Sequence, residues 1–163
     1  HLLVACYWHQ LWEDLWPEPL VQSIWDKAHV LTAEDADYLI SFLEIDPFFF
    51  RSGYVKQKAI TRLRKCPLSA RDRKRIAAII ERAVLAGKER NLTDWLRLTT
   101  LCEPDHLEPV VRMGMASADG VVVRKAILLG LTRMNMGREA GELKRNNYPW
   151  GTAHRIVQAK FCS

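Results

Sequence analysis

The chain has 163 residues, of which 48% are hydrophobic and 26% charged, with 24 Lys and Arg residues against 19 Asp and Glu residues. A chain of this length and composition builds a core of its own, which excludes collagen-like, low-complexity and disordered proteins. No stretch approaches the roughly 18 uninterrupted apolar residues of a membrane span. We therefore expect a single domain over residues 1–163, no membrane partner and a cytoplasmic location.

The N-terminal segment is rich in tryptophan. Three of these residues recur at four-residue intervals, so they share one side of a predicted helix that ends at Pro17. This stripe is either the core face of the first helix or a docking face for a partner protein or a second copy of the chain, because tryptophan is common at interface hot spots. The candidate docking residues are Trp8, Trp12 and Trp16.

The next predicted helix runs from Ala33 to about Ile45. Thr32 is its expected N-cap, and the acidic residues of its first turn favour a helix start. The helix runs into Asp46-Pro47, which ends it. Three consecutive aromatic residues follow, and they cannot all face one core. We therefore predict a second apolar docking site at Phe48, Phe49 and Phe50.

The remaining segments also have the period of amphipathic helices. Helices are expected over Tyr54–Lys65, which Pro67 stops, and over Arg71–Ala86, with Ser69 as N-cap. The only β-like stretch is Val121–Val123, which leads directly into a helical pattern, and no hairpin turn bounds an alternating run. The sequence therefore predicts an all-α protein.

Charge is strongly segregated along the chain. Residues 1–50 hold nine acidic residues and one lysine, whereas residues 51–90 hold thirteen basic and three acidic residues. The basic block has three interpretations: phosphate contacts to nucleic acid with little sequence preference, contacts to an acidic protein partner, or a solvated polar face, either unpaired or paired with the acidic segment of the same molecule or of a dimer mate. The candidate residues lie on two helix faces: Lys58, Arg62 and Lys65, then Arg71, Arg75 and Arg82.

Four glycines, each before a predicted helix, are separated by nearly equal intervals of 34, 33 and 31 residues. Such a period is typical of stacked helix pairs. In sequence, residues 53–60 also align with residues 120–127, sharing Gly, Val, Lys, Ala and Ile. We expect an atypical acidic and aromatic cap over residues 1–50, followed by repeat units over 51–86, 87–119 and 120–150 and a partial unit over 151–163.

About half of the chain resembles the HEAT-like and neighbouring armadillo-like helical repeats. The resemblance rests on an Asp-containing turn, then a helix with Val and, four residues later, Ala, in two stretches: Asp46-Pro47 with Val55 and Ala59, and Asp119 with Val122 and Ala126. It implies a short right-handed stack of antiparallel helix pairs that binds a partner and does no chemistry. A globular helical bundle is the alternative fold. The expected function is thus a recognition or scaffold module for a protein partner or for self-association.

Sequence patterns of enzymes are absent. There is no nucleotide-binding glycine motif, and the five histidines share no local context, so we expect no cofactor and nominate no catalytic residue. Cys102 and His106 lie four apart, but one pair is far from the full ligand set of structural zinc, and the four cysteines are expected as free thiols. Some HEAT-like proteins resemble DNA glycosylases for alkylated bases. That remote alternative would use Trp95 with Asp94, or Tyr38 with Asp37.

Overall fold

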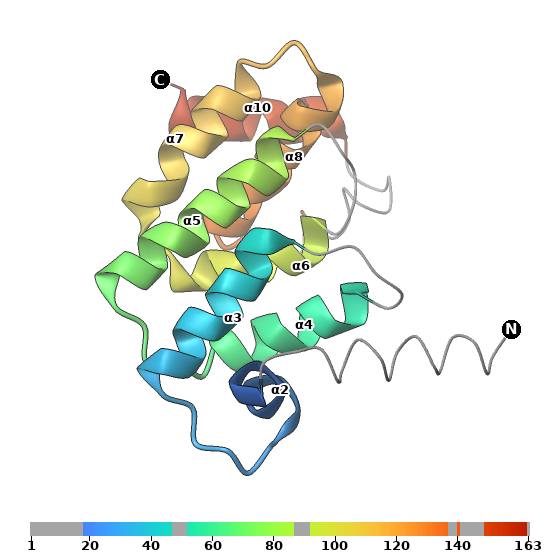
Figure 1. Ribbon diagram of the computed structural model, residues 1–163. Helices are drawn as coiled ribbons and strands as arrows, with labels where there is room; N and C mark the ends of the chain where they lie inside the picture. Colours follow the sequence, from blue (N-terminus) through green and yellow to red (C-terminus); the bar gives the residue numbers. More distant parts are fainter. Residues whose placement is uncertain (1–17, 47–51, 87–91, 137–139, 141–148, 163) are drawn as a thin grey trace, which may run out of the picture. The chain divides into compact units, whose positions relative to one another are not determined.

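The computed structural model describes residues 18–46, 52–86, 92–136, 140 and 149–162, and within these ranges it contains helices and turns but no β-strand (Figure 1). The all-α prediction is therefore confirmed for the described part of the chain. The chain divides into two compact units, His1–Arg75 and Ile76–Ser163. They are called the N-terminal and the C-terminal unit below, and each is described by itself.

Three helices and the first turns of a fourth form the described part of the N-terminal unit. Helix α2 packs against α3 and α4, and α3 packs against α4. Their shared core consists of fully buried aliphatic side chains, among them Leu39, Leu43 and Ile60. The elements are α2 (Glu18–Trp25), α3 (Ala33–Ile45), α4 (Ser52–Leu63) and the start of α5 (Ala70–Leu85).

Helix α3 has the predicted bounds, and local chemistry explains both ends. Thr32 and Asp35 form a capping box, in which the Thr32 side chain accepts from the Asp35 N–H and the Asp35 side chain accepts from the Thr32 N–H. At the other end, Asp46 adopts the left-handed conformation, with φ of 48°, and its N–H bonds to the carbonyl of Phe42. The predictions of the Thr32 cap and of the helix Ala33–Ile45 are confirmed.

Helix α5 begins with the same reciprocal N-cap as α3. The Asp72 N–H donates to Ser69 Oγ over 3.2 Å, and the Ser69 N–H donates to Asp72 Oδ2 over 2.9 Å. The predicted Ser69 cap is thus confirmed. Helix α4 differs slightly from the prediction, because it begins at Ser52 and ends at Leu63, ahead of Pro67. Its end lies in a tight turn, where the Lys65 N–H bonds to the Arg62 carbonyl.

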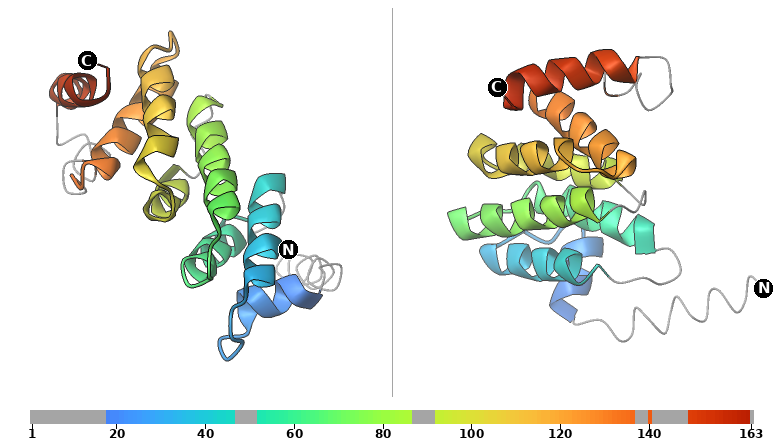
Figure 2. Two further views of the ribbon diagram at one scale, coloured as in Figure 1. Left: turned by 90° about the vertical axis from the view of Figure 1, so that its left-hand side faces the viewer. Right: turned by 90° about the horizontal axis from the view of Figure 1, so that it is seen from above.

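The C-terminal unit contains the rest of α5 and the remaining helices. Helix α7 packs against α8, and α10 packs against both (Figure 2). The contact between α7 and α8 is close because Gly114 has no side chain: a Cβ at that position would lie 2.6 Å from the Ala126 Cβ. The further elements are α6 (Leu92–Leu96), the 3-10 helix η1 (Arg97–Leu101), α7 (Pro104–Met115), α8 (Gly120–Arg133) and α10 (Trp150–Phe161).

The β-like stretch Val121–Val123 lies inside helix α8. Its β-branched side chains favour a strand locally, but Asp119 precedes them and accepts a hydrogen bond from the Val121 N–H over 2.8 Å. This N-cap and the burial of Val122, which is 4% exposed, fix the helix. As for membranes, none of the described helices has the length and apolar character that crossing one requires.

Candidate functional site

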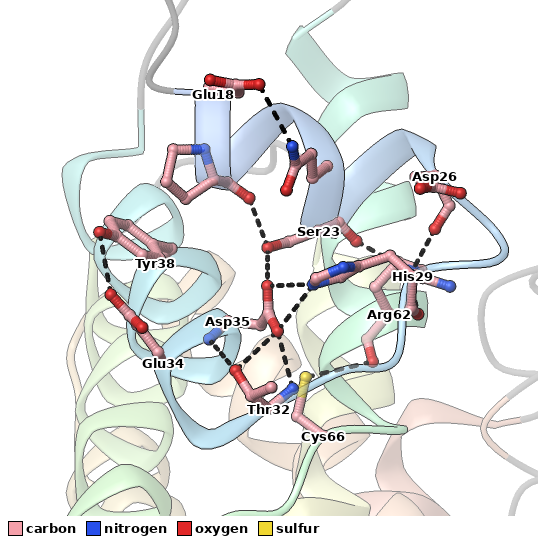
Figure 3. Close-up of polar contacts among 12 residues, drawn as sticks. Glu18, Ser23, Asp26, His29, Thr32, Glu34, Asp35, Tyr38, Arg62 and Cys66 are labelled. Carbon is pink, nitrogen blue, oxygen red and sulfur yellow. Dashed lines mark hydrogen bonds and ion pairs between the residues drawn. The ribbon is translucent and has the colours of Figure 1, made fainter.

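Among the described residues of the N-terminal unit, a polar cluster centres on the carboxylate of Asp35, in the first turn of α3 (Figure 3). Ser23 in α2 donates its hydroxyl to Asp35 Oδ1. His29, in the connection between α2 and α3, places Nε2 at 2.9 Å from the same oxygen. Thr32 donates its N–H and its hydroxyl to Asp35 Oδ2, over 2.7 and 2.8 Å. Asp35 therefore joins the end of α2, the connecting loop and the start of α3.

Hydrogen bonding keeps this carboxylate ionised. Burial alone would raise the pKa of Asp35, but the hydrogen bonds from Ser23, Thr32 and His29 together outweigh it and hold the pKa well below its usual range. The order of the groups is also informative. Ser23 and His29 both bond to the carboxylate, whereas in a hydrolase triad the histidine lies between the serine and the acid. The cluster is thus arranged to connect helices and not to activate a nucleophile.

The thiol of Cys66 lies beside this cluster and is held in its protonated form. Its Sγ donates to the Arg62 carbonyl over 3.7 Å. Burial raises the pKa of Cys66 to about 11, the negative charge of Asp35 adds to that effect, and the positive charge of Arg62 opposes it. A thiol that remains protonated is a poor nucleophile. Cys66 is therefore a packing residue of the α4–α5 turn.

Three of the predicted anion-binding residues make contacts within the N-terminal unit. Arg62 donates to the backbone carbonyls of Ser23, Asp26 and His29, over 2.7, 2.8 and 3.3 Å. It thereby closes the C-terminal end of α2, where unpaired carbonyls favour a positive charge. The Lys58 Nζ lies 4.1 Å from the centroid of the Trp25 ring.

Arg75 makes the third such contact, an ion pair with the acidic N-terminal segment. Its Nε and Nη2 bond to the two carboxylate oxygens of Glu44 over 2.8 and 2.6 Å. Arg75 also bonds to Asp37 and to the hydroxyl of Ser41. Such a bidentate pair is strong and directional. Pairing within the same molecule, one form of the third interpretation of the basic block, is therefore what the structure contains at Arg75.

The other predicted anion-binding residues, Lys65, Arg71 and Arg82, have exposed side chains. Lys65 and Arg71 belong to a dense cluster of basic residues around the turn between α4 and α5, which the two predicted helix faces do not include as a group. Arg64 and Lys74 are also exposed, and neither is among the residues assigned to the two faces from the sequence. The signal that identifies them is charge density around a turn. We define the basic turn as the four exposed side chains Arg64, Lys65, Arg71 and Lys74.

The basic turn joins α4 to α5 and has no internal counter-charge. None of its four side chains forms an ion pair with a residue that the structure describes. The nearest acid in sequence, Asp72, is buried and bonds to Ser69. Between the two pairs of bases lie Pro67, which is exposed, and Leu68, which is half-buried. A small apolar centre is thus flanked by positive charge on both sides.

The predicted apolar docking residues lie outside the described residues, so they remain predictions: Trp8, Trp12, Trp16, Phe48, Phe49 and Phe50. Of the residues considered for base excision, Trp95 is buried, with 6% exposed, and Asp37 is bound by Arg75. Within the described ranges, no three His, Cys, Asp or Glu side chains converge on a metal position.

The chain was compared with protein-family models, with curated proteins and with solved structures. It matches none of them. The resemblance to helical repeats therefore rests on the residues of this chain alone.

Proposed function

We propose that the chain is a non-catalytic helical-repeat module that recognises an acidic protein surface through the basic turn. The observation that carries this proposal is the unpaired charge of that turn. Arg62 and Arg75 flank it in sequence and have partners in the N-terminal unit, whereas Arg64, Lys65, Arg71 and Lys74 face solvent. Uncompensated charge of one sign steers partners of the opposite sign.

Two features support the repeat character. Helices α3 and α5 begin with the same reciprocal cap, Thr32 with Asp35 and Ser69 with Asp72. The two segments that align in sequence bury the same three apolar positions, although Lys58 is half-buried where the aligned Lys125 is buried. Exposed fractions are 0% and 4% for Val55 and Val122, 0% for both Ala59 and Ala126, and 1% and 2% for Ile60 and Ile127. Equal burial at aligned positions is expected when helices have equivalent places in a stack.

The chemistry of the polar groups supports a binding role. Each Asp35 oxygen is bonded by at least two groups, Ser23 and His29 at Oδ1 and the Thr32 N–H and hydroxyl at Oδ2, and Cys66 stays protonated, so neither has the free lone pair or thiolate that a catalytic group needs. Both groups contribute to the junction of α2, α3 and α4 instead. In the described part of the chain, the exposed charge and not a reactive cluster is the feature available to a partner.

A protein partner fits the basic turn better than nucleic acid. Base recognition requires amide or aromatic side chains among the phosphate contacts. Residues 64–74 contain neither, and their hydroxyl group, Ser69 Oγ, is used in the α5 cap. Pro67 and Leu68 supply instead the apolar centre, surrounded by charge, that is typical of protein interfaces.

The test is fluorescence anisotropy with a labelled glutamate-rich peptide, labelled duplex DNA and labelled single-stranded RNA, at low and physiological salt. We expect the peptide to bind, and the triple variant Lys65→Glu, Arg71→Glu, Lys74→Glu to lose that binding. A matched control carries the same charge reversals at three exposed bases elsewhere: Lys27→Glu, Arg155→Glu and Lys160→Glu.

Equal losses in the two triple variants would mean that only net charge matters, and would contradict the proposal. Binding of DNA or RNA that persists at physiological salt and exceeds peptide binding would favour the nucleic-acid alternative. Circular dichroism of both variants verifies that the helices are intact.

A further inference from the structure

A second candidate site lies in the C-terminal unit, at the N-terminal ends of α8 and α10. A depression of about 410 Å³ that is broadly open to solvent, called the cavity below, lies there between the two helices. This volume falls in the range of small-ligand pockets. Val123 and Ile127 of α8 and Trp150 of α10 supply its apolar surface. Gly120 and Gly151 also line it, and a Cβ built at either glycine would meet no atom within 4 Å.

One positively charged side chain, Arg124, lines this apolar surface. The guanidinium carbon of Arg124 lies 5.6 Å from the centroid of the Trp150 ring, so the side chain is held at the cavity. Arg124 makes no hydrogen bond or ion pair with the residues that the structure describes. His154, one helical turn beyond Trp150, also lines the cavity. The pocket therefore holds a guanidinium whose donors are not used in the described part of the fold.

The start of α10 adds polar donors of its own. This helix has twelve residues, and its N-cap, Pro149, has no side chain that accepts a hydrogen bond. The Pro149 carbonyl accepts from Thr152 and Ala153, whereas the Trp150 and Gly151 N–H groups bond to no described residue. Unpaired N–H groups in a first turn favour a bound negative charge. Trp150 and Gly151 line the same cavity as Arg124.

From these observations we infer that the cavity binds an aromatic or aliphatic group that carries a carboxylate. The apolar group packs on Trp150, Val123 and Ile127, and the carboxylate bonds to Arg124 and the N–H groups at the start of α10. A carboxylate matches the donor set better than a phosphate, because a single guanidinium fork pairs with two oxygens and one charge. The nearby carboxylate of Asp119 is used within α8, where it accepts from the Val121 N–H, and does not line the cavity.

This inference is independent of the proposed function, since the basic turn belongs to the other unit. The carboxylate has two possible sources, a free small molecule or the end of a peptide. The same groups of the cavity would bind either one. The probes must therefore test the contribution of the charge, the contribution of the apolar group, and which kind of molecule carries the carboxylate.

The experiment is a titration of the full-length chain with 3-phenylpropionate, followed by amide chemical shifts in ¹H–¹⁵N spectra. We expect saturable shifts of the Gly120 and Gly151 amides, with a Kd in about the millimolar range for a probe of this size. Three further probes dissect the recognition: 3-phenylpropanol lacks the charge, propionate lacks the ring, and phenyl phosphate changes the anion. A short peptide ending in phenylalanine supplies the other source of the carboxylate.

Two variants and one control make the test specific. Arg124→Gln should weaken 3-phenylpropionate binding about tenfold, the loss expected for one charged hydrogen-bonding partner. Gly151→Leu should abolish binding by filling the cavity, with the helix content retained because the position is open. Arg155→Gln removes a charge from an exposed position of α10 that does not line the cavity, and should change nothing.

Three results would overturn the inference: no amide shifts with 3-phenylpropionate, equal binding of 3-phenylpropanol, or equal losses in the Arg124→Gln and Arg155→Gln variants. Tighter binding of phenyl phosphate than of 3-phenylpropionate would overturn the carboxylate assignment. Should Gly151→Leu fail to fold, the comparison of the two arginine variants still decides the question.

Discussion

Arg62 donates a hydrogen bond from Nε to the backbone carbonyl of Ser23, 2.7 Å away and 39 residues earlier in the chain. The same side chain reaches the carbonyls of Asp26 and His29, so it occupies the C-terminal end of α2. The last carbonyls of a helix have no partner within the helix, and a cation there also interacts favourably with the helix dipole. Arg62 is thus a cap supplied by a neighbouring helix.

In the C-terminal unit, basic side chains of one helix also bind backbone carbonyls near the end of another helix. Lys125, which is 4% exposed, donates from Nζ to the Ala83 carbonyl in the last turns of α5, over 2.8 Å. Arg112 donates to the carbonyl of Phe161, the last residue of α10. Part of the positive charge of this chain is therefore structural, and a count of basic residues overstates the charge that a partner can reach.

Replacement of Arg62 by alanine should lower the free energy of unfolding by about 1.5–3 kcal/mol, because it removes charged hydrogen bonds to backbone carbonyls. Lys65→Ala is the matched control, since Lys65 is exposed and ends the same sequence stripe; we expect a change within about 0.5 kcal/mol. Urea denaturation followed by circular dichroism measures both. Equal effects of the two substitutions would show that Arg62 is not the cap of α2.

The sequence shows why these two residues could not be separated in advance. In the predicted helix Tyr54–Lys65, the residues Lys58, Arg62 and Lys65 share one face, and helical periodicity alone gives them equivalent roles, whereas α4 ends at Leu63 and leaves Lys65 in the turn. The distinction arises from α2, which ends against Arg62 and leaves Lys65 in solvent. Contacts between segments 39 residues apart have no local signal. The caps of α3 and α5, by contrast, depend on neighbours three residues apart, and the sequence predicted both.

The apolar cavity at α8 and α10 illustrates the same limit. Arg124 and Trp150 are 26 residues apart, and neither was singled out as a site from the sequence. The sequence alone shows glycines at the starts of predicted helices. The open space beside Gly120 and Gly151, however, depends on how two helices approach each other. Helix bounds follow from local residues, whereas pockets follow from packing.

Acid should destabilise the protein through Asp35. Because the folded state lowers the pKa of Asp35 below the ordinary value of 3.8, its stabilising effect is complete above that value and is lost progressively as the pH falls below it. Asp35→Asn removes this dependence and several hydrogen bonds to a buried charge, so we expect a loss of about 2–4 kcal/mol at neutral pH. The loss should shrink as the pH falls from about 4 to about 2.5.

Thermal unfolding of both proteins across this pH range is the measurement. Asp105→Asn is the control, since Asp105 is exposed and its substitution should change stability by about 0.5 kcal/mol or less. Parallel pH curves for the wild type and Asp35→Asn would contradict the assignment of the acid sensitivity to Asp35.

Alkylation should discriminate between the described cysteines. Cys162 is exposed, Cys102 is buried, and burial raises the pKa of the half-buried Cys66 to about 11. Because the thiolate is the reactive form, iodoacetamide at pH 8 should modify Cys162 before Cys66 and Cys102 in the folded protein. Peptide mapping by mass spectrometry follows each site, and the same reaction in denaturant equalises the rates. Modification of Cys66 as fast as Cys162 in the folded state would contradict the protonated thiol.

Gly114 is a position at which a single added methyl group should destabilise the fold. A Cβ there would lie 2.6 Å from the Ala126 Cβ, and that neighbour cannot rotate away, so α7 and α8 must separate. Alanine is favoured over glycine in a helix by about 1 kcal/mol, but overpacking of a closed contact costs about 1–3 kcal/mol. We therefore expect Gly114→Ala to destabilise the protein despite its better helix propensity.

Gly120→Ala is the control. A Cβ at this position meets no atom within 4 Å, so the substitution should be neutral or slightly stabilising. Urea denaturation of the two variants measures the difference in their free energies of unfolding. If Gly114→Ala were as stable as Gly120→Ala, α7 and α8 would not be in close contact at Gly114.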